Sequence, residues 1–123
     1  MDVRRKILYV DDEEINLLLF ESNFKSLYNV IIAHDGFEGL KVLEDNPDTL
    51  VIISDMKMPG MNGIEFIKKA KTKYPDKKYY ILTGFEITDE IKKAMESGLI
   101  LEYFSKPFEV KRMHNIIKEA FEN

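Results

Sequence analysis

The sequence predicts a doubly wound α/β fold, in which five helices flank a five-stranded parallel sheet. Short apolar runs of strand length alternate five times with longer stretches of helical period. One run, at residues 50–53, is apolar on both faces, which is typical of a central strand covered by helices on each side. Strands that alternate with helices in this way predict parallel pairing with right-handed crossovers.

The first two strands and helices are predicted within residues 7–44. Residues 7–10 form a strand that stops at two consecutive aspartates. A second strand is expected at residues 30–33, and Asp35 then caps a helix that runs from Gly36 to about Glu44. The helix between the two strands carries a stripe at helical spacing that is expected to face the core: Ile15, Leu18, Leu19 and Ser22.

The third strand, with its apolar run at residues 50–53, ends on an acid, Asp55. Residues 58–63 then form a loop rich in turn-forming residues, and the helix after it ends before Pro75. The fourth strand is expected at residues 79–82 and ends at Thr83.

The last part of the chain repeats the pattern. Gly98 is the expected C-cap of the fourth helix, and residues 101–105 form the fifth strand, which ends at Lys106. The fourth and fifth helices are identified by two apolar stripes: Ile87, Ile91, Ala94 and Met95, and then Val110, Met113, Ile117 and Ala120.

Length and composition fit one domain over residues 1–123 and exclude several classes of function. The net charge of -4, from 18 basic and 22 acidic side chains, argues against binding to nucleic acid through a basic surface. Without cysteine there is no disulfide framework and no thiolate site, which fits a cytoplasmic protein. No signal peptide is predicted, and no segment approaches the ~20 apolar residues of a membrane helix.

Polar, reactive residues follow four of the five predicted strands. In an open parallel sheet, ligands bind beyond the carboxyl ends of the strands. If the strand order is 2-1-3-4-5, the ends of strands one, three, four and five lie side by side. The residues expected to converge at that edge are Asp11, Asp12, Asp55, Thr83 and Lys106.

This set of side chains predicts phosphoryl chemistry. Three carboxylates repel one another and favour a cation, and Mg²⁺ suits a site with few carboxylates and retained waters. One carboxylate can attack phosphorus and form an acyl phosphate, while the cation and Lys106 neutralise charge on the phosphoryl oxygens. Thr83 would hydrogen-bond one of those oxygens. Each residue alone has an ordinary structural explanation, but their joint placement at successive strand ends does not.

The sequence resembles the receiver domains of bacterial response regulators over essentially its whole length. Four segments carry the resemblance: ILYVDDE at 7–13, DMKMPGMNG at 55–63, LTG at 82–84 and YFSKPF at 103–108. It implies a flavodoxin-like fold with strand order 2-1-3-4-5. It also implies that Asp55 is phosphorylated, with Mg²⁺ as cofactor.

The resemblance implies further roles for the residues at this edge. Asp12 and Asp55 would bind the metal directly, Asp11 through water, and Lys57 through its backbone carbonyl. Thr83 would reorient on phosphorylation, and Tyr103 matches the family's switch aromatic. Lys106 would pair with the phosphoryl oxygens, through a cis peptide bond to Pro107.

Two features depart from the common pattern of the family. Between Gly98 and Lys106 the chain has one residue more than many members, so the partner that uses the face of helix four, strand five and helix five does not transfer. The bulky Phe85 stands two residues after Thr83, and we expect it to shield the phosphoryl group from water and lengthen its lifetime.

The expected function is a two-component signalling switch that turns over no external substrate. The partners would be a histidine kinase or phosphotransfer protein, and an output domain or partner protein; a homodimer on phosphorylation is also open. An aspartate-nucleophile phosphohydrolase is disfavoured, because it would want an acid where Lys57 stands. The other alternative is an interaction module of receiver fold that acts without phosphorylation. The cognate kinase, and whether the chain is a stand-alone regulator or part of a longer protein, stay open.

Overall fold

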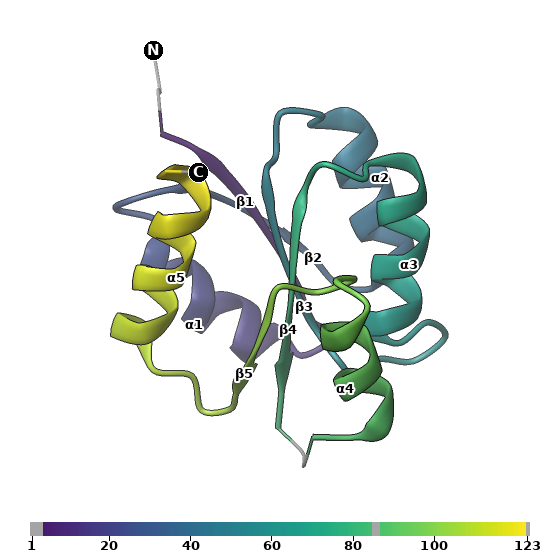
Figure 1. Ribbon diagram of the computed structural model, residues 1–123. Helices are drawn as coiled ribbons and strands as arrows, with labels where there is room; N and C mark the ends of the chain where they lie inside the picture. The colour runs from purple at the N-terminus through teal and green to yellow at the C-terminus, as the bar shows by residue number, and fades with distance from the viewer. Residues whose placement is uncertain (1–3, 85–86, 123) are drawn as a thin grey trace.

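A five-stranded parallel sheet forms the centre of the molecule (Figure 1). The computed structural model describes residues 4–84 and 87–122. The strand order β2-β1-β3-β4-β5 confirms the predicted fold. The strands are β1 (Lys6–Val10), β2 (Asn29–Ala33), β3 (Val51–Asp55), β4 (Lys78–Thr83) and β5 (Glu102–Ser105).

Five helices cover the two faces of the sheet. In Figure 1, α1 and α5 lie on one side of the strands, and α2, α3 and α4 lie on the other. The five are α1 (Glu14–Phe24), α2 (Gly36–Asp45), α3 (Gly63–Lys73), α4 (Asp89–Glu96) and α5 (Val110–Glu122). Successive residues of a strand point to opposite faces, so each strand contributes to two apolar clusters. Leu8, Ile52 and Ile81 pack under α2–α4, whereas Tyr9, Ile53 and Leu82 pack under α1 and α5.

The strand β3 is longer than its apolar run predicts. Ser54 and Asp55 continue the strand and pair with Ile81 and Leu82 of β4. Both residues are buried although they are polar. The strand therefore ends on Asp55, as predicted, and the sheet ladder fixes the position of this residue.

Side chains near the helix ends explain where the helices start and stop. Asp35 accepts a hydrogen bond from the backbone N–H of Glu38 at 2.8 Å, which confirms it as the cap of α2. Asn62 and Glu65 form a reciprocal capping box at the start of α3. Gly98, with a φ of 79°, ends the turn after α4 in the left-handed conformation that favours glycine.

The predicted core stripe of α1 is wrong. Three of its members are about half exposed or more: Ile15 at 60%, Leu18 at 50% and Leu19 at 49%. The side that packs on the sheet consists of Leu17, Phe20 and Phe24, all fully buried. Because α1 is apolar on both sides, helical periodicity could not distinguish the core face from the exposed one.

The extra residue before β5 is accommodated by one buried and one exposed apolar side chain. Ile100 is buried in the cluster under α2–α4, and its N–H donates to the carbonyl of Ala94 at 3.2 Å. Leu101 is 52% exposed, while its N–H donates to the carbonyl of Tyr79 at 2.9 Å. Leu101 therefore adds an apolar side chain to the surface directly before β5.

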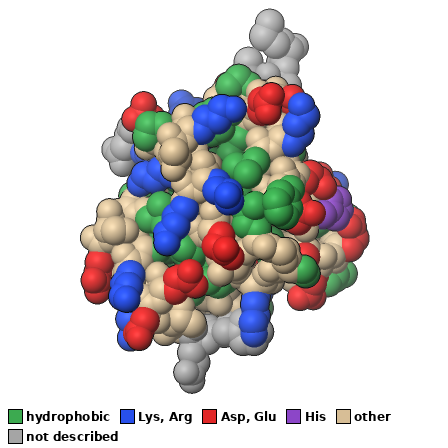
Figure 2. All heavy atoms as spheres, turned by 90° about the vertical axis from the view of Figure 1, so that its right-hand side faces the viewer, with side chains coloured by type: hydrophobic (Ala, Val, Ile, Leu, Met, Phe, Trp, Pro, Cys, Tyr) green, Lys and Arg blue, Asp and Glu red, His purple; other side chains and the backbone are tan. Residues whose placement is uncertain are grey.

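The face seen from the side of α2, α3 and α4 is mixed in charge. Figure 2 shows lysine and acidic side chains interspersed there, with hydrophobic atoms between them. Within residues 4–84 and 87–122, no helix has both the length and the apolar character that a membrane crossing requires.

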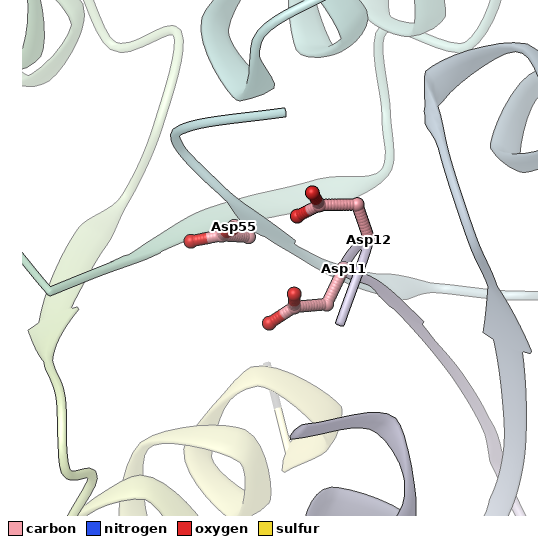
Figure 3. Close-up of side chains that lie close together, drawn as sticks. All are labelled: Asp11, Asp12 and Asp55. Carbon is pink, nitrogen blue, oxygen red and sulfur yellow. The ribbon is translucent and has the colours of Figure 1, made fainter. Parts of the chain in front are cut away.

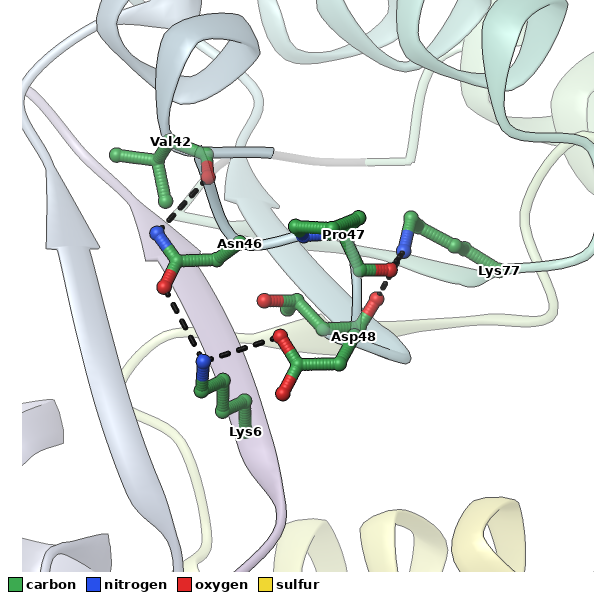
Figure 4. A network of polar contacts seen from close by, with 7 residues as sticks. Lys6, Val42, Asn46, Pro47, Asp48 and Lys77 are labelled. Carbon is green, nitrogen blue, oxygen red and sulfur yellow. Dashed lines mark hydrogen bonds and ion pairs between the residues drawn. The ribbon is translucent and has the colours of Figure 1, made fainter. Parts of the chain in front are cut away.

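Two lysines fasten the loop after α2 at the end of the sheet opposite the acidic residues (Figure 4). Lys6 contacts Asn46 at 3.3 Å and Asp48 at 3.0 Å. Lys77 donates to the carbonyls of Pro47 at 2.6 Å and Thr49 at 2.5 Å. Burial lowers the pKa of Lys77. The ammonium thus satisfies two carbonyls of the turn, which is also tied to α2 by hydrogen bonds from Asn46 to the carbonyl of Val42.

Replacement of Lys77 by Met is therefore expected to lower the free energy of unfolding by about 2 kcal/mol, because hydrogen bonds from a charged donor are lost while the side-chain length is kept. Urea unfolding followed by circular dichroism measures the change. Lys69→Met is the matched control, since Lys69 is exposed on α3, and it should shift the value by less than about 0.5 kcal/mol. Equal effects of the two substitutions would contradict the role given to Lys77.

Candidate functional site

Three carboxylates from two neighbouring strands meet at the carboxyl edge of the sheet. Asp11 and Asp12 directly follow β1, and Asp55 ends β3, which pairs with β1. One oxygen from each of the three carboxylates lies within 4.8 Å of the others. Figure 3 shows the three side chains converging on a common space. The predicted convergence of these aspartates is thus present in the structure.

Lys106 joins this cluster from the end of β5. Its Nζ lies 3.0 Å from Oδ1 of Asp55 and 3.3 Å from Oδ2 of Asp11. Asp11 is fully buried and Asp55 is 5% exposed, whereas Asp12 faces solvent. The peptide bond between Lys106 and Pro107 is cis, as expected. The Lys106 ammonium therefore contacts two of the three carboxylates, those of Asp55 and Asp11.

The electrostatics of the site raise the pKa of Asp55 above its usual value. Burial raises the pKa of Asp55 to about 6, against the lowering effect of its hydrogen bond to Lys106, and the charges of Asp11 and Asp12 raise it further. Burial by itself lowers the pKa of Lys106, but the bonds and charges of Asp55 and Asp11 outweigh it and raise the pKa overall. A hard divalent cation with oxygen ligands would relieve this repulsion, so the donor set fits Mg²⁺.

Two donors to Asp11 were not predicted. The hydroxyl of Tyr9 donates to Oδ2 of Asp11 at 2.5 Å, and the backbone N–H of Glu13 donates to Oδ1 at 3.0 Å. Burial, and then the charge of Asp11, raise the pKa of Tyr9 far above its usual range, so the hydroxyl stays protonated. The signal was in the sequence: residues two apart in a strand share a face, so Tyr9 and Asp11 point the same way.

The remaining predicted residues lie on β4, on β5 and in the loop after β3. Thr83 is buried at the end of β4, and its carbonyl accepts the backbone N–H of Lys106 at 2.8 Å. Tyr103 is half-buried on β5 opposite Ile81. Lys57 is exposed in the loop after β3. Phe85 lies outside the described residues.

An open pocket of about 660 Å³ gives access to the acidic cluster. Asp55 and Lys106 form part of its lining, and so do the exposed Asp12 and Lys57. The pocket also touches Gly84, where an added Cβ would meet only Lys106 atoms at 3.6 Å or more. A small anion can therefore reach the Asp55 carboxylate and the ammonium group of Lys106 beside it.

Comparison with known proteins decides the family. The family model described as the response regulator receiver domain matches residues 7–118 of the chain. The chain belongs to the receiver domain family of two-component response regulators.

Similar receiver proteins match over nearly their full length. The sporulation initiation phosphotransferase F of Bacillus subtilis is 34% identical over 119 residues, covering 95% of this chain and 94% of that protein. The probable chemotaxis protein CheY of Rhizobium etli is 32% identical, with 94% and 92% covered. A receiver domain crystal structure from Clostridium thermocellum superposes with a TM-score of 0.90 at 31% identity, covering 96% of this chain and 94% of that one.

Other relatives are much longer than this receiver domain. The cyclic di-GMP phosphodiesterase of Thermotoga maritima is 30% identical over 118 residues, but the chain spans only 31% of that protein. The phosphodiesterase activity that this relative is named for is said of the whole, longer protein. Receiver domains are signalling domains, and this match gives the present chain no phosphodiesterase role.

Proposed function

We propose that residues 1–123 act as one receiver domain, in the cytoplasm, that accepts a phosphoryl group on Asp55 and thereby controls a partner protein or output domain. One observation carries the proposal. The Asp55 carboxylate borders an open pocket, contacts Lys106 at 3.0 Å, and lies beside two further carboxylates that suit a divalent cation.

Each residue of the acidic cluster, and Lys106, has a separate role in the phosphoryl transfer. An oxygen of Asp55 attacks phosphorus, the bond from phosphorus to the donor's nitrogen or oxygen breaks, and the leaving group departs with that electron pair. Lys106 neutralises charge on the phosphoryl oxygens. Asp12, Asp55, the carbonyl of Lys57 and, through water, Asp11 would hold Mg²⁺. When bound, Mg²⁺ supplies positive charge to the same oxygens.

Phosphorylation then shifts a two-state equilibrium. A hydroxyl at Thr83 can follow the new phosphoryl oxygens, and the space it leaves is available to Tyr103, one strand away. Tyr103 lines a surface pocket with Arg112 and Pro107, formed by β5, the start of α5 and the segment between them, on the side of the proposed α4, β5 and α5 face. This face is the proposed contact for an output domain, a partner or a second phosphorylated copy.

A protein phosphodonor, either a histidine kinase or a phosphotransfer protein, needs a docking surface beside Asp55. The exposed apolar side of α1, formed by Ile15, Leu18 and Leu19, supplies one. The helix begins two residues after Asp12, so a protein that binds there is held next to the pocket. Exposed apolar side chains gathered on one helix face are typical of protein interaction sites.

The test is phosphorylation by a small donor. With Mg²⁺ and acetyl phosphate, the intact mass of the protein is expected to rise by one phosphoryl group, and an excess of EDTA should prevent the gain. Acetyl phosphate suffices because the catalytic groups all belong to this chain. An unchanged mass with Mg²⁺ present would instead support the interaction module that works without phosphorylation.

A further inference from the structure

Tyr9 places a buried hydroxyl on the acidic cluster. The side chain is fully buried on β1, and its hydroxyl lies 2.5 Å from Oδ2 of Asp11. The phosphoryl chemistry described above gives this hydroxyl no role. A buried tyrosine hydroxyl needs a hydrogen-bond partner, and here the partner is a carboxylate at the candidate metal site.

Asp11 is held by three donors. Tyr9 and Lys106 both donate to Oδ2, at 2.5 and 3.3 Å, and the N–H of Glu13 donates to Oδ1 at 3.0 Å. The bond from Tyr9 is the shortest of the three. Lys106 also bonds Asp55, so its ammonium is shared between two carboxylates. Of the two side chains that donate to Asp11, Tyr9 is thus the one whose hydrogen bond goes to Asp11 and not also to Asp55.

Aromatic packing fixes the position of the hydroxyl. The Tyr9 ring stacks on Phe20 at 4.4 Å between centroids with an interplanar angle of 19°. Phe20 in turn contacts Phe24 at 4.7 Å and Phe108 at 6.0 Å. These rings come from α1 and from the segment before α5, which pack in the same apolar cluster, and the stack with Phe20 holds the Tyr9 ring against α1. The hydroxyl is thereby held beside the Asp11 carboxylate.

We propose that Tyr9 is a positioning residue that sets the orientation of the Asp11 carboxylate for the divalent cation. Without the hydroxyl, the carboxylate can rotate toward Lys106, and binding of the cation must then reorient it. Hydrogen bonds that orient metal-site groups in this way typically change metal affinity by about 10–100-fold. The inference rests on the proposed metal role of the acidic cluster.

Tyr79 provides a matched comparison. It is also a buried strand tyrosine, and its hydroxyl donates to the backbone carbonyl of Tyr74 at 2.8 Å. It packs under α2–α4, in the cluster on the other side of the sheet from Tyr9. Removal of either hydroxyl deletes one buried hydrogen bond, but only that of Tyr9 touches the acidic cluster.

The experiment compares Tyr9→Phe with Tyr79→Phe in the full chain. Isothermal titration with MgCl₂ should show a Kd raised roughly tenfold or more in Tyr9→Phe and unchanged in Tyr79→Phe. Labelling by acetyl phosphate should slow in Tyr9→Phe at low Mg²⁺ and recover at saturating Mg²⁺. Thermal unfolding without metal should show similar losses of stability for both variants, because each loses one hydrogen bond.

Three outcomes are distinguishable. A Kd in Tyr9→Phe equal to that of the wild type overturns the positioning role and leaves Tyr9 as a satisfied core residue. Slow labelling that saturating Mg²⁺ does not restore also overturns it, because the defect then does not act through the cation. A wild-type protein that binds no Mg²⁺ overturns the metal part of the proposed function itself.

Discussion

Substitution of Asp55 by Asn is expected to abolish phosphorylation and, at the same time, to stabilise the metal-free protein above pH 6. The carboxamide cannot form the acyl phosphate, so no label should enter from acetyl phosphate at any Mg²⁺ concentration. It can still accept a hydrogen bond from Lys106, which contacts the carboxylate at 3.0 Å. Loss of function would thus come with a gain in stability, which excludes misfolding as its cause.

The direction of the stability change follows from the raised pKa. Burial raises the pKa of Asp55 from 3.8 to about 6 in the folded protein, so ionisation favours the unfolded state. This carboxyl therefore stabilises the fold fully below about pH 4, and that contribution is lost as the pH rises through 6. Asn carries no charge, so its advantage over Asp55 should be on the order of 2 kcal/mol at pH 8 and should vanish near pH 4.

Thermal unfolding of both proteins between pH 4 and pH 8, in EDTA, measures this effect. Addition of Mg²⁺ at pH 8 should stabilise the wild type more than Asp55→Asn. Asp48→Asn is the control, because Asp48 is an exposed aspartate paired with Lys6 at the opposite end of the sheet. It should be phosphorylated normally and show no gain in stability at pH 8. A pH-independent difference between Asp55→Asn and the wild type would contradict the account of the site.

Gly63→Ala should be strongly destabilising. An added Cβ would overlap the backbone carbonyl of Asp55 and lie 2.8 Å from Cδ1 of Ile81. The neighbouring Met56 backbone is only 3.1 Å away, and the N–H of Gly63 is bonded to the carbonyl of Met56 at 2.8 Å. Since the obstructing atoms belong mainly to backbone, the start of α3 must move away from β3.

The expected loss for Gly63→Ala is about 3 kcal/mol, which corresponds to a fall in Tm of roughly 10 °C. Gly84→Ala serves as the control, because a Cβ there meets side-chain atoms of Lys106 at ordinary contact distances of 3.6 and 3.9 Å. Differential scanning calorimetry should separate the two variants. A Tm for Gly63→Ala within two degrees of the Gly84→Ala value would show that α3 is not held against β3 as described.

The fold could be predicted in almost every respect, because strand runs, turns and caps reinforce one another along the chain. The error lies in α1, where apolar character and burial disagree. Ile15 and Leu18 are apolar but exposed, so helical spacing wrongly placed them on the core face. Ser54 and Asp55 show the converse, since both are polar but belong to a buried strand.

The composition of the acidic cluster could be predicted because parallel strands end at one edge of the sheet. The Tyr9 donor was missed although strand alternation places Tyr9 and Asp11 on one face, because hydrophobicity assigns Tyr9 to the core and gives its hydroxyl no partner. Backbone donors such as the N–H of Glu13 leave no mark in the sequence at all. The number of hydrogen bonds at Asp11 therefore emerges only from the three-dimensional arrangement.

The two-sided character of α1 has an evolutionary consequence. Phe20 and Phe24 hold the helix on the sheet, whereas Ile15 and Leu18 project from it. Selection on recognition can therefore change the projecting residues without altering the packing that keeps the chain folded. If partners dock there as proposed, duplicated copies of such a gene can diverge to separate phosphodonors through a few surface substitutions, and signals within one cell stay insulated from each other.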